Sequence, residues 1–316
     1  LRWTSRDARG VGAARILLVF VSIAFAAGAE DVPFPVEDFS SVPGSSGIAS
    51  RLLAFDGMLL FFVDDGEEGK ELWKSDGTSE GTLPAEYIPL ADPDDWPDDV
   101  TLFQGGLFFA GDDGEGQGVE LWRTDGTEEG TALFVDINPF GDANPSSFVV
   151  LGDIMLFRAR EPYRGTELWK TDGTPEGTVI VKDIDPDGSS YPRELTVAGD
   201  TLFFLADDGQ TGLELWRSDG TRRGTVLVKD LNPSGSIEID ALVGGDELVY
   251  FVYDDDVHGE QLWKSDGTEA GTAMVKAVVD YSRELTNKPI RLTPVGSTLF
   301  FVAADGLSGI ELGKSD

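Results

Sequence analysis

Short apolar stretches alternate with glycine- and aspartate-rich turns along most of this 316-residue chain. The pattern is clearest over residues 194–231, where ELTVAG, TLFFLADD, LELWRSD and TVLVKDL follow one another with turns between them. Short runs of β-branched and aromatic residues bounded by Gly, Asp and Asn are typical of antiparallel strands. No stretch keeps a helical period. The pattern therefore predicts a unit of four successive strands.

The second strand of this unit is apolar at consecutive positions, Leu202, Phe203, Phe204 and Leu205. A strand with one face in water would alternate instead, so both faces of each sheet are expected to be covered. Small four-stranded sheets that cover one another are the building blocks of a β-propeller. A solenoid of stacked sheets is the alternative.

The unit carries a motif, ELWRSDGTRRGT, that begins at Glu214 and recurs along the chain. Its tryptophans are 49, 47, 47 and 47 residues apart, which indicates an internal repeat: Trp73, Trp122, Trp169, Trp216 and Trp263. We expect Leu and Trp of each copy to pack between sheets. The Asp-Gly pair is expected to turn the chain into the fourth strand, with its glycine at positive φ.

The two ends of the chain complement each other in this pattern. A sixth copy, which has Gly313 in place of Trp, stops after its third strand, while Val36–Glu37–Asp38–Phe39 resembles the end of a fourth strand. We predict an all-β, six-bladed β-propeller of four-stranded antiparallel blades, the last blade closed by the N-terminal strand at residues 30–47. The expected blades span about residues 48–90, 91–140, 141–187, 188–235, 236–283 and 284–316. A fragment of a longer array is the alternative.

At the repeated ELW and DGT residues the sequence resembles the bacterial exported ELWxxDGT-repeat family, also described as hyalin-repeat-like. The likeness covers most of the chain after residue 30. It implies an exported β-propeller-type protein, and the family has no established common activity.

Residues 1–29 differ from the repeats. Arg2, Arg6, Arg9 and Arg15 precede or border an apolar run at 16–26, and small residues follow at 27–29. This is the pattern of a secretory signal peptide. We expect a secreted, cell-surface or periplasmic protein without a membrane span, because a span needs about 20 apolar residues.

The chain has 58 acidic and 24 basic residues, for a formal net charge of -34. This balance excludes nucleic acid as an expected partner, since phosphate binding needs clustered Lys and Arg. It attracts cations, but an acidic surface suited to salty surroundings explains it equally well. There are no cysteines, so disulfides and thiolate sites are excluded.

In a four-stranded blade, the turns after strands two and four emerge on one face, which here collects many carboxylates. The sequence DIDPDGSSYPRE at 183–194 fits a calcium-loop pattern on that face. The candidate metal ligands are Asp183, Asp185, Asp187 and Glu194, with calcium as the candidate cofactor. An ordinary repeat linker is the alternative, because similar Asp-Pro segments occupy the equivalent places.

Two departures from the repeat mark candidate ligand-binding residues on the same face. Copy three has RAREPYRG in place of an acidic turn, which gives Arg158, Arg160, Tyr163 and Arg164, and Trp96 lies in a loop outside the repeated strands. Arg and Tyr suit carboxylate recognition and sugar stacking. Alternatively the arginines neutralise neighbouring carboxylates, and Trp96 covers a blade edge.

Signals for catalysis are weak. Ser79 fits G-x-S-x-G, but other residue types fill its place in the other copies, and the strand-to-helix turn of a nucleophile elbow is not expected. The sole histidine, His258, has no second imidazole near it in sequence. Paired carboxylates for glycoside hydrolysis stay an alternative.

We therefore expect a monomeric, exported, non-enzymatic binding or adhesion propeller with an extracellular protein or polysaccharide as partner. A hydrolase or lyase that acts on polysaccharide is the alternative.

Overall fold

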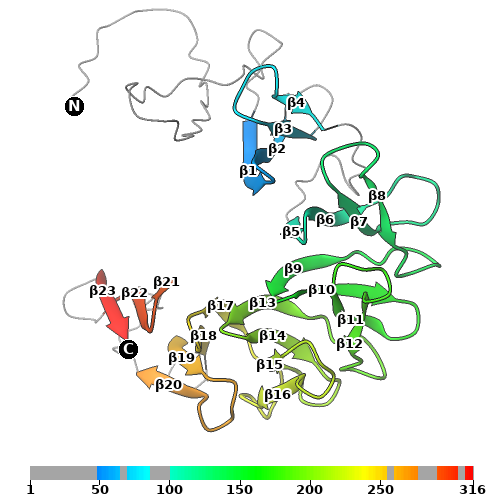
Figure 1. Ribbon diagram of the computed structural model, residues 1–316. Coiled ribbons are helices and arrows are strands. Elements are labelled where there is room, and N and C mark those ends of the chain that lie inside the picture. The colour runs from blue at the N-terminus through cyan, green and yellow to red at the C-terminus, as the bar shows by residue number, and fades with distance from the viewer. Residues whose placement is uncertain are drawn as a thin grey trace, which may run out of the picture. The chain divides into compact units, whose positions relative to one another are not determined.

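The computed structural model describes residues 48–64, 70–85, 100–254, 260–276, 290–304 and 310–315. Every regular element in them is a β-strand (Figure 1), so the all-β prediction is confirmed for this part of the chain. The same residues contain no helix that is long and apolar enough to cross a membrane. The predicted closing strand at 30–47 lies outside them.

The residues form two compact units, which are taken separately. The first combines the chain up to Asp98 with Thr124–Thr131, and the second combines Asp99–Arg123 with the chain from Ala132 onward. Sheet 1 lies in the first unit and has its strands in chain order: β1 (Ile48–Phe55), β2 (Met58–Asp64), β3 (Lys70–Ser75) and β4 (Leu83–Pro84).

The remaining sheets lie largely in the second unit and are also antiparallel with neighbours in chain order. Sheet 2 comprises β5 (Thr101–Phe103), β6 (Gly106–Gly111), β7 (Glu120–Thr124) and β8 (Ala132–Val135). Sheet 3 comprises β9 (Ser146–Leu151), β10 (Ile154–Glu161), β11 (Gly165–Thr171) and β12 (Val179–Lys182). Sheet 4 comprises β13 (Arg193–Ala198), β14 (Thr201–Asp207), β15 (Leu213–Ser218) and β16 (Val226–Lys229). The four-strand unit is therefore confirmed.

Sheet 5 repeats this arrangement, and sheet 6 has three strands among the described residues. Sheet 5 comprises β17 (Ile239–Gly244), β18 (Val249–Asp254), β19 (Glu260–Ser265) and β20 (Ala273–Lys276). Sheet 6 comprises β21 (Ile290–Val295), β22 (Thr298–Ala304) and β23 (Ile310–Ser315).

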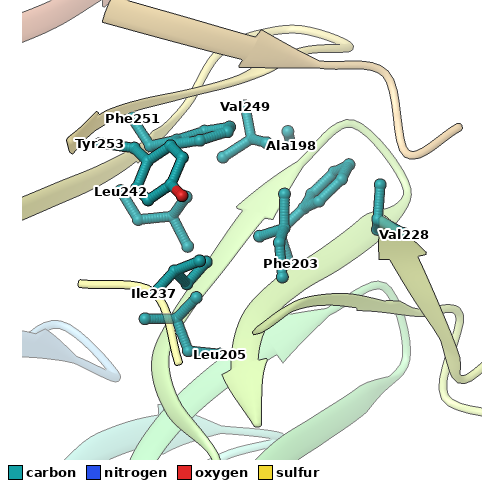
Figure 2. Close-up of a cluster of buried hydrophobic side chains, with 10 residues drawn as sticks. Ala198, Phe203, Leu205, Val228, Ile237, Leu242, Val249, Phe251 and Tyr253 are labelled. Carbon is teal, nitrogen blue, oxygen red and sulfur yellow. The ribbon is translucent and has the colours of Figure 1, made fainter. Parts of the chain in front are cut away.

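The consecutive apolar residues of β14 serve both faces of sheet 4, as their sequence predicts. Phe203 and Leu205 pack with residues of sheet 5, including Phe251 (Figure 2), whereas Leu202 and Phe204 pack with residues of sheet 3. Since successive side chains of a strand point to opposite faces, neither face of this strand is left for water.

The Leu-Trp pair of the motif does the same on the third strand. Leu215 belongs to the cluster between sheets 4 and 5, and Trp216 to the cluster between sheets 3 and 4. Trp169 and Trp263 likewise pack against the sheet before their own. The prediction that these residues pack between sheets is confirmed in the second unit.

Lysines add polar links between the same sheets. The Nζ atom of Lys182 donates to Thr225 O of the next sheet at 2.9 Å and lies 5.0 Å from the ring centroid of Trp216. Lys170 donates to Gly220 O at 2.9 Å, and Lys229 donates to Thr272 O at 3.2 Å. Each ammonium group therefore joins its own sheet to a turn of the following one.

The DGT turn is a closed hydrogen-bond network. In sheet 4, Asp219 Oδ1 accepts from Thr221 N at 2.8 Å and from Thr221 Oγ1 at 2.7 Å, and Thr221 Oγ1 accepts from Gly224 N at 3.0 Å. The hydroxyl of Thr225 donates to Thr221 O at 2.7 Å. The side-chain bond from Thr221 lowers the pKa of Asp219. Gly220 has a φ of 79°, as predicted for the turn.

The second glycine of the motif has a separate cause, which the sequence did not reveal. A Cβ atom on Gly224 would overlap the carboxylate of Asp219, which folds back over this position. The repeated residues of this string, Ser218 to Thr221 with Gly224 and Thr225, are thus required by one turn, so they mark structure rather than chemistry.

Sheet 6 departs from the repeat at Gly313, where the other copies have Trp. The ring of Phe301, its cross-strand partner on β22, occupies the space over Gly313 that a Cβ atom would enter. Leu312 is 72% exposed, whereas the equivalent Leu168, Leu215 and Leu262 are 0% exposed. One face of sheet 6 is therefore uncovered among the described residues.

Candidate functional site

The loops that could carry function gather at one end of the strands in the second unit. The linker after β12 hydrogen-bonds to β11 through Tyr191 N and Thr166 O at 3.2 Å, and to β14 through Asp207 N and Ser190 O at 3.0 Å. The linker after β16 is tied to β15 in the same way, with Ile237 N donating to Leu213 O at 2.8 Å. The linkers and the turns after the second strands therefore share a face, as predicted.

A buried glutamate holds the linker after β12 in place. Glu167, the first residue of its ELW motif, is 0% exposed and receives three hydrogen bonds from the linker after β12. Its Oε2 accepts from Ile184 N at 2.9 Å and from Ser190 Oγ at 2.6 Å, and its Oε1 accepts from Ser190 N at 2.9 Å. Both carboxylate oxygens are thus used to fix the loop that carries the predicted calcium ligands.

The same contact recurs at the neighbouring junctions. Glu120 accepts from Ile137 N at 2.6 Å, and Glu214 accepts from Leu231 N at 2.9 Å. In sheet 5 the amide of Gln261 occupies this position and is also 0% exposed. Sequence reasoning missed this role, although a charged residue that recurs beside Leu-Trp in an apolar strand was the available signal.

Burial raises the pKa of Glu120, Glu167 and Glu214 to about 7 in each case. The nearby carboxylates of Asp136, Asp183 and Asp230 act in the same direction, whereas the hydrogen bonds from the linkers oppose the shift. The loss of hydration outweighs these hydrogen bonds and raises the pKa, because a buried carboxylate gives up its contacts with water and gains only a few donors.

The predicted ligand-binding residues of copy three lie on and beside the turn between β10 and β11. Arg158 is half-buried, and its Nε donates to Ser146 Oγ at 2.6 Å within its own sheet. Arg164 is paired with Glu161 at 3.1 Å and with Asp183 at 3.5 Å. Arg160 and Tyr163 are exposed. Trp96 lies outside the described residues.

The predicted calcium ligands are spread along the linker after β12 and the start of β13. Asp183 Oδ2 faces Arg164 Nε, and Asp185 Oδ1 accepts from Asp187 N at 3.2 Å. Glu194 is exposed on β13. No group of three or more His, Cys, Asp or Glu side chains within the described ranges is arranged to hold a metal ion. Calcium binding here stays a prediction.

The weak catalytic signals gain no support. Ser79 lies in the DGT turn between β3 and β4, and its carbonyl accepts from Thr82 N at 3.3 Å. The next described element is strand β4 rather than a helix, so this is not a nucleophile elbow. His258 lies outside the described residues.

The buried glutamates make stability depend on pH. Their pKa is about 7 in the folded state but near its ordinary value of 4.5 in the unfolded chain, so the folded state holds extra protons between these values. Stability therefore falls as pH rises through this window. We expect each glutamate to contribute a loss of roughly 2 to 3 kcal/mol between about pH 5 and about pH 8.

Urea unfolding at the two pH values tests this. Glu214→Gln introduces the residue type that sheet 5 already has at Gln261, and it should remove about a third of the pH dependence because one of three groups no longer titrates. The exposed Glu176→Gln is the matched control and should keep the full slope. Equal slopes in Glu214→Gln and the parent would show that these glutamates are not the source.

No family model matches the chain, and no curated protein matches it. Among solved structures, a prolyl endopeptidase from a structural and mechanistic study of two such enzymes aligns with 92% of this chain. The alignment covers 42% of the endopeptidase chain, at 14% identity and a TM-score of 0.51. Prolyl oligopeptidase B from Galerina marginata, bound to a hydrolysis and macrocyclization substrate, aligns with 84% of this chain and 42% of its own, at 12% identity and a TM-score of 0.52.

These likenesses are to the β-propeller domains of the peptidases, and they show the fold alone. The chain spans less than half the length of the peptidases it matches. The matches overturn the expectation of a non-enzymatic binding or adhesion propeller, together with its alternative of a polysaccharide hydrolase or lyase, because the similar scaffolds belong to peptidases.

Proposed function

We propose that this chain is the propeller scaffold of a peptidase-related protein. The observation that carries the proposal is the alignment of 84–92% of this chain with 42% of two prolyl peptidases. In this proposal the propeller binds peptide substrates, and the catalytic groups that hydrolyse them lie outside the described residues.

The residues available in the described part of the chain support a binding role without catalysis there. A Ser-His-Asp triad needs a histidine beside its serine, and the single histidine of the chain, His258, lies outside the described residues. The serines that begin the repeated turns, Ser75, Ser218 and Ser265, are buried and bonded within the turn, as Ser218 is to Thr225 at 2.7 Å. They are unsuited to attack a peptide bond.

The proposed scaffold is a closed ring of six blades, with residues 30–47 adding the fourth strand to sheet 6. Two features support closure. The outer edge of β23 has no partner strand among the described residues, and Leu312 is 72% exposed where its equivalents are buried. Export, a monomeric state and calcium binding are retained as expectations of the same proposal.

The peptidase role can be tested on the native protein. An antibody against residues 146–254 would isolate the protein together with any attached or associated chains, and the isolate would be assayed with a fluorogenic proline peptide. We expect cleavage that a fluorophosphonate serine-hydrolase probe abolishes, and none in a mock isolate. An isolate that contains the chain but leaves the peptide intact would refute the role.

Closure can be tested by cross-linking, because the chain has no cysteine of its own. If the closing strand pairs as β16 does in sheet 4, where Leu215 pairs with Lys229, the sequence alignment puts Glu37 opposite Leu312 in the proposed ring. Glu37→Cys with Leu312→Cys should therefore form an intramolecular disulfide under mild oxidation. Glu37→Cys with Val295→Cys, an exposed site at the opposite edge of sheet 6, is the control and should not. Equal yields would contradict closure.

A further inference from the structure

Two exposed tyrosines lie on neighbouring loops of sheet 3. Tyr163, in the turn between β10 and β11, is 81% exposed, and Tyr191, in the linker after β12, is 61% exposed. The two loops are joined where Tyr191 N donates to Thr166 O at 3.2 Å and Thr166 N donates to Ser189 Oγ at 2.9 Å. The two rings are therefore presented from one hydrogen-bonded pair of loops.

Packing does not account for the tyrosine at position 191, and backbone geometry opposes it. Its φ is 45°, in the left-handed region, and it precedes the buried Pro192. Asn144 occupies the equivalent place before Pro145, with a φ of 47° and the equivalent hydrogen bond to Val119 O. Asn adopts this conformation at low cost, whereas Tyr does so less readily. The conformation recurs before the proline of both linkers, and Asn would adopt it at lower cost than Tyr.

Two arginines close in sequence to these tyrosines have no ion pair within the described residues. Arg160 is exposed and is the cross-strand partner of Thr166, and Arg193 is exposed two residues after Tyr191. Within the described part of the chain, the salt bridges involve Arg164 and neither of these two. Exposed guanidinium groups without an ion pair are suited to bind carboxylates, also on a protein of net charge -34.

We propose that Tyr163, Tyr191, Arg160 and Arg193 form a docking surface for an acidic, proline-containing peptide. Aromatic rings pack against the preformed extended helix of proline-rich segments, and guanidinium groups bind carboxylates in pairs of hydrogen bonds. These arginines attract an acidic peptide, whereas the surrounding acidic loops repel it. Charge therefore directs such a peptide to the arginines rather than to the rest of this face. The proposal rests on the peptidase-related function and names the surface where such a peptide is held.

The test measures fluorescence anisotropy of a labelled peptide of alternating Glu and Pro with the purified full chain at low salt. Tyr191→Asn should weaken binding about tenfold, the effect of losing one anchoring contact, without lowering the unfolding midpoint. Arg160→Gln with Arg193→Gln should weaken binding by at least as much. Peptides of alternating Lys and Pro, or Glu and Ala, should bind at least about tenfold more weakly.

The matched control is Arg222→Gln with Arg223→Gln. It removes the same charge from the exposed turn between β15 and β16, at the other end of the strands, and should leave binding unchanged. The proposal would be overturned if Tyr191→Asn bound the Glu-Pro peptide as tightly as the parent does. It would also be overturned if the parent bound the Glu-Ala peptide as tightly as the Glu-Pro peptide. A native isolate that cleaves proline peptides while the purified chain does not bind the probe would refute this surface alone. Binding without cleavage would refute only the peptidase role.

Discussion

Sheets 3, 4 and 5 are apolar on both faces, and this constraint governs the rest of the structure. A single four-stranded sheet cannot bury two faces by itself, so each one needs a sheet on either side. Leu215 and Trp216 show the solution in two adjacent residues, since one packs toward sheet 5 and the other toward sheet 3.

The polar residues of the repeat work inside that arrangement. The DGT network closes the turn before the fourth strand, and the buried glutamate of the ELW motif fixes the linker to the next sheet. Lys182 joins one sheet to a turn of the following one. These repeated polar residues are used in contacts within the scaffold. Exposed loop residues such as Tyr191 and Arg193 are therefore the ones available to contact a partner.

The strand order and the packing of the tryptophans could be predicted because apolar runs and turn residues are local signals. The recurring glutamate beside Leu-Trp was a signal in the sequence, but its partners could not be predicted, since Glu167 contacts a linker that follows the next strand along the chain. Gly313 was correctly seen as a departure, but the sequence did not reveal that Phe301 fills its place. The predicted function was wrong because charge and loop composition describe a surface without identifying the scaffold's relatives.

The central claim is that both faces of sheets 3, 4 and 5 are buried. It is tested most directly by measuring the free energy of unfolding of Leu215→Ala and Trp216→Ala, two neighbours on opposite faces. Both should lose about 2 to 5 kcal/mol, since each leaves a cavity between sheets, while the exposed Val179→Ala should lose far less. A large loss in one of the pair and less than about 1 kcal/mol in the other would mean that one face is open to water, contrary to the claim.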